Sequence, residues 1–261
     1  EEVSLPVMVC MDGFILTHAY ERVDVPSQEQ VDSFLPPYEP RQVLDPKNPV
    51  SIGAMVGPEA FAEVRYLAHA KQMQALELIP KMAEQFKAVF GRESGGLTHS
   101  YLTDDADTIV VAMGSVLGTI KDTVDEMRAA GEKIGVLGIT SYRPFPIESV
   151  RAALQNAQRV VVLEKSLAVG IGGILSTDVR MAMSGLQLHG HTVVAGLGGR
   201  AITRKSLRAL FAKAARGELK VEKARALATR LAAIRGLGLL QDPAQRSALE
   251  PLLGDADENV R

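Results

Sequence analysis

Cysteine, tryptophan and charge imbalance are scarce in this sequence. Its 261 residues include one cysteine and no tryptophan, aromatic residues make up 5%, and the formal net charge is -2. One cysteine excludes a disulfide framework and a cysteine-ligated metal cluster within the chain. A net charge close to zero provides no basic field for nucleic acid. No apolar run is long enough to span a bilayer, so we expect a cytoplasmic protein that binds neither nucleic acid nor membrane.

Strand and helix patterns alternate between Asp104 and Gly217. The strand patterns are short, rich in Val and Ile, and apolar on both sides of the pleat, whereas the segments between them have helical spacing. The predicted strands are Thr108–Met113, Ile134–Ile139, Arg159–Leu163 and Thr192–Ala195, and the predicted helices are Val116–Ala130, Ile147–Ala157, Ile174–Met183 and Arg204–Arg216. This alternation predicts an α/β fold with a mostly parallel, doubly wound sheet.

The sequence opens with an apolar segment, Leu5–Met11, that has the pattern of a strand. An edge strand this apolar would be prone to aggregate if it stood alone. We therefore expect the chain to be the C-terminal part of a longer polypeptide, with residues 1–25 forming the final strand and loop of a preceding domain. Cys10 lies within this segment, and we expect it to be a buried structural thiol.

Four polar or small residues follow this predicted strand, namely Asp12, Gly13, Thr17 and His18. Functional residues of parallel α/β folds gather at the carboxyl ends of strands. We hypothesise that these four lie near a cofactor. The alternative is a turn with a structurally satisfied histidine at a domain or subunit boundary.

Residues 26–103 combine a proline-rich strap with a long helix. Seven prolines lie between Pro26 and Pro58, which predicts an extended, ordered strap. Glu59–Phe90 has helical spacing, and Pro80 inside it predicts a kink or a break into two helices. The Met and Phe stripe of this helix is typical of a core or a subunit interface.

One glycine-containing loop starts the first helix of the α/β unit. Gly114-Ser115 closes a strand, and Gly118-Thr119 lies in the first helical turn. Backbone amides at such a position can bind an anion. Because GSxxGT is neither a Walker loop nor GxGxxG, we expect Ser115 to be a helix N-cap instead.

Two further loops follow the second and third strands of the unit. Tyr142–Pro146 places Arg143 in a rigid, proline-containing loop. Gly170, Gly172 and Gly173 precede a helix and permit close backbone approach, either to a ligand or to a neighbouring chain. We mark Arg143 and the three glycines as interface candidates.

The remaining features predict structure and no chemistry. His189-Gly190-His191 reads as a turn, because no carboxylate or cysteine lies nearby in sequence to complete a metal site. Residues 218–261 read as a helical C-terminal tail that includes an amphipathic helix at Val221–Ile234. No nucleophile has a base beside it, and no cofactor fingerprint is complete, so we assign no catalytic and no metal-binding residue.

Taken together, the segments LPVMVCMDGFILTH, MGSVLGTIK, YRPFP, VVVLEKS with GIGG, and AGLGGR resemble the α subunit of the pyruvate (2-oxoacid):ferredoxin oxidoreductases. The resemblance covers roughly residues 1 to 216. Residues 104–217 resemble the transketolase C-terminal-like domain of that family. Residues 1–25 resemble the end of the pyrimidine-type domain of thiamine enzymes.

The resemblance implies a coenzyme A-dependent oxidative decarboxylation of pyruvate or a related 2-oxoacid, with electrons passed to ferredoxin. The complete complex would be an oligomer containing thiamine diphosphate, Mg²⁺ and 4Fe-4S clusters. These cofactors would be bound by other domains or by a β subunit, so that this chain is mainly scaffold and subunit interface and is inactive alone. The alternative is a non-catalytic nucleotide-binding or structural α/β module that uses the Gly114–Thr119 or Gly196–Arg200 loop.

Overall fold

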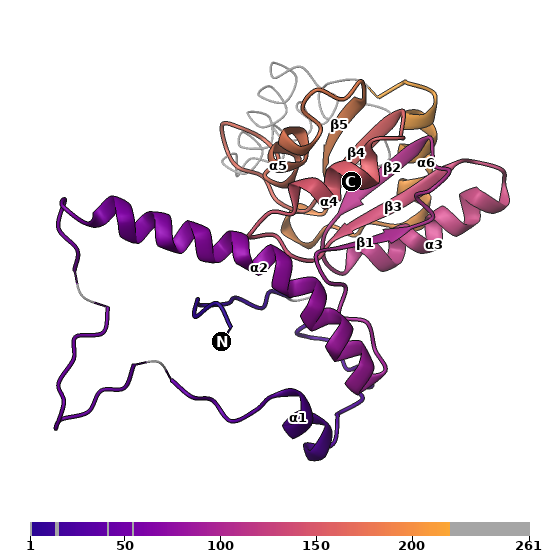
Figure 1. Cartoon of the computed structure of the whole chain (residues 1–261). Coiled ribbons are helices and arrows are strands. Elements are labelled where there is room, and N and C mark those ends of the chain that lie inside the picture. The colour runs from indigo at the N-terminus through magenta and orange to yellow at the C-terminus, as the bar shows by residue number, and fades with distance from the viewer. Residues whose placement is uncertain (1, 14–15, 41, 54, 220–261) are drawn as a thin grey trace, which may run out of the picture. The chain divides into compact units, whose positions relative to one another are not determined.

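The computed structural model describes residues 2–13, 16–40, 42–53 and 55–219 (Figure 1). The chain divides into two compact units, Glu1–Leu207 and Arg208–Arg261. Within the second unit, Arg216 pairs with Glu218 at 2.8 Å between Nε and Oε1. The predicted helix at Val221–Ile234, and all of the predicted tail beyond residue 219, lie outside the described residues.

Five strands form one mostly parallel sheet in the order β1-β3-β2-β4-β5. Its strands are β1 (Thr98–Tyr101), β2 (Thr108–Ala112), β3 (Ile134–Ile139), β4 (Arg159–Glu164) and β5 (His189–Val194). Strand β1 runs antiparallel to β3, whereas the β2/β3, β2/β4 and β4/β5 pairs are parallel. Every residue of β2 and β3 is buried. The predicted α/β fold with a mostly parallel sheet is thus confirmed.

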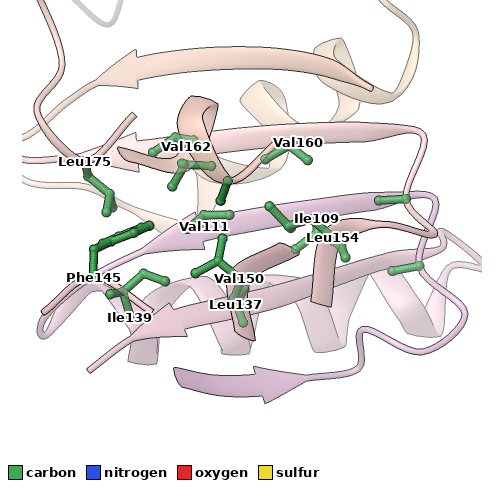
Figure 2. Close-up of a cluster of buried hydrophobic side chains, with 14 residues drawn as sticks. Ile109, Val111, Leu137, Ile139, Phe145, Val150, Leu154, Val160, Val162 and Leu175 are labelled. Atoms are coloured by element: carbon green, nitrogen blue, oxygen red, sulfur yellow. The ribbon is translucent and has the colours of Figure 1, made fainter. Parts of the chain in front are cut away.

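Helices α3 (Val116–Ala129), α4 (Ile147–Leu154) and α5 (Leu175–Ala182) pack on this sheet. The other helices are α1 (Gln28–Phe34), α2 (Phe61–Phe90) and α6 (Arg204–Ala215), and α1 packs on α2. Figure 2 shows the core beneath α4 and α5, where Val150 and Leu154 of α4 pack with Ile109 and Val111 of β2. Because side chains alternate along a strand, Val110 faces the opposite side, which α3 covers.

The strap preceding α2 contains one short helix that the sequence analysis did not predict. Helix α1 starts with a capping box, in which the Ser27 hydroxyl accepts from the Gln30 amide and the Gln30 side chain accepts from the Ser27 amide. Phe34 at its end packs edge-on against Phe86 and Phe90 of α2, with ring centroids 5.7 and 5.4 Å apart. The S-x-x-Q spacing was the sequence signal for this helix.

Helix α2 continues through Pro80, so the predicted alternative of a break into two helices is wrong. The helix ends at Gly91, whose φ of 66° provides a left-handed C-cap. None of the helices within the described residues has the length and apolarity that a membrane crossing needs.

Three sequence-based expectations were wrong. Leu5–Met11 forms no strand in the described residues, and Cys10 is exposed, because no described strand lies beside this segment. His189-Gly190-His191 is not a turn but the start of β5, since Arg159 of β4 pairs with His189. The polar strand β1 was not predicted as a strand at all.

Candidate functional site

Asp12 connects the N-terminal segment to the carboxyl edge of the sheet. Its Oδ2 accepts a hydrogen bond from the Ser115 backbone amide at 2.7 Å and a very short one from the Ser115 hydroxyl. Its Oδ1 accepts from Lys165 Nζ at 3.1 Å. Ser115 follows β2 and Lys165 follows β4, so residues far apart in the sequence meet at one place.

This place is the topological switch point of the sheet. The chain leaves β2 for β3 on one side, and it leaves β4 for β5 on the other side. Connections that diverge in this way open a crevice outside the carboxyl ends of the two strands, where α/β proteins commonly bind ligands. Here the Asp12 carboxylate occupies that position.

Two glycines lie beside this arrangement. Gly114 has a φ of 79°, and a Cβ added there would lie 3.0 Å from Asp12 Oδ2. Gly196, after β5, has a φ of 75°, and a Cβ there would lie 3.0 Å from Ile202 Cδ1. Both positions therefore require glycine for backbone conformation and for space.

Ser115 occupies the N-cap position of α3, as predicted, but its side chain makes no cap hydrogen bond. The hydroxyl donates to Asp12 instead, and the Asp12 carboxylate also accepts from the Ser115 amide at the N-cap. An anion at this end of the helix is favoured by the helix dipole. The hydrogen bond from the Ser115 hydroxyl lowers the pKa of Asp12, which partial burial raises, and the Ser115 amide and Lys165 lower it further.

A second carboxylate fills the N-terminus of α5. Glu164, the last residue of β4, is only 5% exposed. Its Oε2 accepts from the Ile174 and Leu175 amides at 2.7 and 2.8 Å, and its Oε1 accepts from the Ser176 amide at 3.2 Å. Sequence analysis singled out the glycine cluster before α5 but not this acid.

The three interface-candidate glycines shape the loop before α5, and Gly173 lies against this buried acid. Gly170 and Gly172 have φ angles of 91° and 101°, and Ala168 pairs with Gly172 in a tight hairpin. At Gly173, a Cβ would lie 1.9 Å from Glu164 Oε1. The hairpin tip exposes two apolar side chains, Val169 at 95% and Ile171 at 72%.

Arg143 is held by neighbours within its own domain. Its Nη2 lies 3.0 Å from Asp178 Oδ2 of α5, and its guanidinium stacks 4.2 Å from the centroid of the Tyr142 ring. Burial, followed by the nearby Asp178 carboxylate, raises the pKa of Tyr142. The Arg143 side chain is still 55% exposed, so its outer face is accessible.

Thr17 and His18 contact each other, with Thr17 Oγ1 3.1 Å from His18 Nδ1, and both are exposed. The Leu16 amide donates to the Asp12 carbonyl at 3.4 Å, which closes a turn between Asp12 and this pair. A Cβ at Gly13 would meet nothing within 4 Å. The structure thus ties one of the four predicted cofactor residues, Asp12, directly to the sheet edge.

The two segments that meet at Asp12 each match a known family. Residues 106–207 match pyruvate:ferredoxin oxidoreductase core domain II, and residues 1–84 match the thiamine diphosphate-binding part of pyruvate flavodoxin/ferredoxin oxidoreductase. This chain belongs to the 2-oxoacid:ferredoxin oxidoreductase α-subunit family. Asp12 lies in the segment that matches the thiamine diphosphate-binding part, whereas Ser115 and Lys165 lie in the segment that matches core domain II.

Curated members of the α-subunit family are similar over most of this chain. The chain is 45% identical over 211 residues to pyruvate synthase subunit PorA of Methanosarcina barkeri, covering 79% of this chain and 52% of that protein. It is 34% identical over 213 residues to ketoisovalerate oxidoreductase subunit VorA of Pyrococcus horikoshii, covering 80% and 54%. The chain therefore spans about half the length of the curated relatives it matches.

Among solved structures, the chain aligns with a 2-oxoglutarate:ferredoxin oxidoreductase from Magnetococcus marinus at a TM-score of 0.41 and 16% identity. The alignment covers 60% of this chain and 23% of that one. A likeness at this TM-score carries no argument, so the fold assignment rests on the sheet topology described above.

Proposed function

We propose that this chain is part of the α subunit of a thiamine diphosphate-dependent 2-oxoacid:ferredoxin oxidoreductase, in which it acts mainly as scaffold and subunit interface. One observation supports the scaffold role. A carboxylate in the segment matched to thiamine binding is bound by two residues of core domain II, Ser115 and Lys165. The chain therefore holds these two parts of the enzyme in register.

The proposed reaction is the oxidative decarboxylation of a 2-oxoacid. The acyl group passes to coenzyme A, carbon dioxide leaves, and the electrons reduce ferredoxin. We propose pyruvate as the substrate, because the relatives at 45% and 43% identity carry the name pyruvate synthase, whereas the ketoisovalerate relative is at 34%. We place the complex in the cytoplasm.

The described residues do not fit the cofactors of such a complex. Residues 2–13, 16–40, 42–53 and 55–219 contain no group of three or more His, Cys, Asp or Glu that could hold a metal ion. At the N-terminus of α5, where a diphosphate would find amides, Glu164 accepts from three of them, and Asp12 accepts from the N-cap amide of α3. We therefore assign thiamine diphosphate, Mg²⁺ and the 4Fe-4S clusters to other domains or to a β subunit, and we assign no catalytic residue to this chain.

Two surfaces of the chain are candidates for contact with those other parts. Gly13, Thr17 and His18 follow Asp12 and would face the cofactor side. Arg143 and the hairpin containing Gly170 and Gly172, with Gly173 at its base, would contact a neighbouring subunit. The exposed apolar tip of the hairpin supports the second assignment, since such side chains are commonly covered in an assembly.

The nucleotide-binding alternative would use the Gly114–Thr119 or the Gly196–Arg200 loop. A phosphate at the Gly114–Thr119 loop would have to displace Asp12. Titration of the chain with ADP by calorimetry tests this alternative directly. We expect no heat of binding, and saturable binding would favour the nucleotide module.

The function is tested on the native complex, purified through this chain. We expect co-purifying partner subunits, bound thiamine diphosphate and iron, and pyruvate oxidation that requires both coenzyme A and ferredoxin. 2-Oxoisovalerate and 2-oxoglutarate serve as competing substrates in the same assay. A chain that purifies alone, with no cofactor and no partner, would contradict the proposal.

A further inference from the structure

We infer that Asp12 is a positioning residue of the proposed enzyme. Its carboxylate latches the segment that carries Thr17 and His18 onto the switch point of core domain II. The activity part of this inference rests on the proposed function, whereas the latch itself rests on the contacts of Asp12 alone.

The recess that receives Asp12 is built for a carboxylate. It combines two neutral donors from Ser115, one cation from Lys165, and the positive end of α3. Gly114 removes the side chain that would crowd the carboxylate. Two strand ends, those of β2 and β4, thus contribute to one contact.

The residues that form this contact lie far apart along the chain. Asp12 lies 103 residues before Ser115 and 153 residues before Lys165. The strap and α2 lie between them, so the covalent chain alone does not fix where the segment after Asp12 lies. A contact that closes such a long loop determines that position.

Asp12 acts through this segment and not on the substrate. Oδ2 accepts from two donors and Oδ1 from a third, and the side chain is only 20% exposed. Releasing it would displace the segment without removing a group that binds the 2-oxoacid. We therefore expect the loss to appear in kcat, with KM for the 2-oxoacid little changed.

The test uses the complete complex with Asp12→Asn, and with Lys165→Met as a second variant that breaks the contact from the opposite side. The first measurement is amide exchange at Ser115, because the described acceptor of that amide is Asp12. Loss of a charge-assisted hydrogen bond in a partly exposed site predicts roughly tenfold faster exchange in Asp12→Asn. The second measurement is steady-state kinetics with pyruvate, where kcat falls about tenfold and KM changes less than about twofold.

Asp105→Asn is the matched control. Asp105 pairs with Arg128 at 2.8 Å, and Arg128 lies in the core domain II match, which begins one residue after Asp105. We expect unchanged Ser115 exchange and unchanged kcat. The double variant Asp12→Asn/Lys165→Met should lose no more activity than Asp12→Asn, because both changes break the same contact.

The outcomes separate the latch from the function. Unchanged Ser115 exchange in Asp12→Asn overturns the latch, whatever the activity. Faster exchange with unchanged kcat overturns the positioning role, and a rise in KM with constant kcat shows that Asp12 binds substrate instead. A wild-type complex without 2-oxoacid oxidation refutes the proposed function, while the exchange measurement still decides on the latch.

Discussion

Substitutions at Glu164 and Gly173, at the start of α5, should have non-additive effects on the free energy of unfolding. The perturbations are Glu164→Ala, Gly173→Ala and the double variant. In Glu164→Ala, three backbone amides lose their charged acceptor, and two of them belong to residues that are 4% and 1% exposed, Leu175 and Ser176. Both of these residues are almost fully buried in the folded chain.

The magnitude follows from the two buried amides. Leaving both without an acceptor costs about 4 kcal/mol, within a total stability of about 5–15 kcal/mol. Gly173→Ala places a Cβ 1.9 Å from Glu164 Oε1 and 2.3 Å from Ser176 Oγ, so the carboxylate must leave. We expect the same loss of about 4 kcal/mol from Gly173→Ala, because it empties the same acceptor position.

The assay is urea unfolding of the 261-residue chain followed by circular dichroism. Once Ala stands at position 164, the clash of the Cβ at position 173 with the carboxylate is gone, and the Ser176 hydroxyl that is left can rotate away, so the double variant should be close in stability to Glu164→Ala. Gly118→Ala is the control, since a Cβ there meets nothing within 4 Å and α3 should gain up to about 1 kcal/mol. Additive losses in the double variant would refute the reasoning.

Three further predictions concern other parts of the chain. The pKa of Asp12 is depressed below its ordinary 3.8. The difference in the free energy of unfolding between wild type and Asp12→Asn should therefore be constant above about pH 5 and vanish as the pH falls through the folded pKa. Urea unfolding at several pH values measures this difference. Arg143→Ala should cost the chain less than about 1 kcal/mol, because the ion pair with Asp178 is half exposed, yet weaken subunit association about tenfold; unchanged assembly and turnover would remove Arg143 from the interface. Gly135→Ala should lower the unfolding midpoint sharply, since its Cβ would lie 2.3 Å from the Leu102 carbonyl oxygen, and a midpoint equal to wild type would contradict this close approach.

The centre of the sheet could be predicted because its signal is local. Strands β2 and β3 are apolar on both faces and lie between amphipathic helices, and their observed bounds agree with the predicted ones to within one residue. The edge strands β1 and β5 lack this apolar pattern. Strand β1 is polar and forms by pairing with β3, and β5 begins at His189 only because Arg159 of β4 lies beside it. Pairing of this kind depends on tertiary contacts that periodicity does not report.

Part of the candidate site could likewise be predicted from the sequence, and part could not. Asp12 was predicted as a site residue from its position after an apolar segment, but its partners were not, because they lie 103 and 153 residues away. The prediction that Cys10 is buried failed because it assumed a sheet around Leu5–Met11, which no described strand provides. Whether Thr17 and His18 face a cofactor stays a prediction.

Carboxylates accept hydrogen bonds from backbone amides at the start of both α3 and α5. An open α/β sheet offers amides at the carboxyl ends of its strands, and a ligand-binding domain leaves them free for an anion. Here Glu164 fills one terminus from ten residues away and fixes the domain's own fold. Asp12 fills the other from a different segment and fixes that segment to the domain. Under the proposed scaffold role, the switch point holds the segment that matches the thiamine diphosphate-binding family.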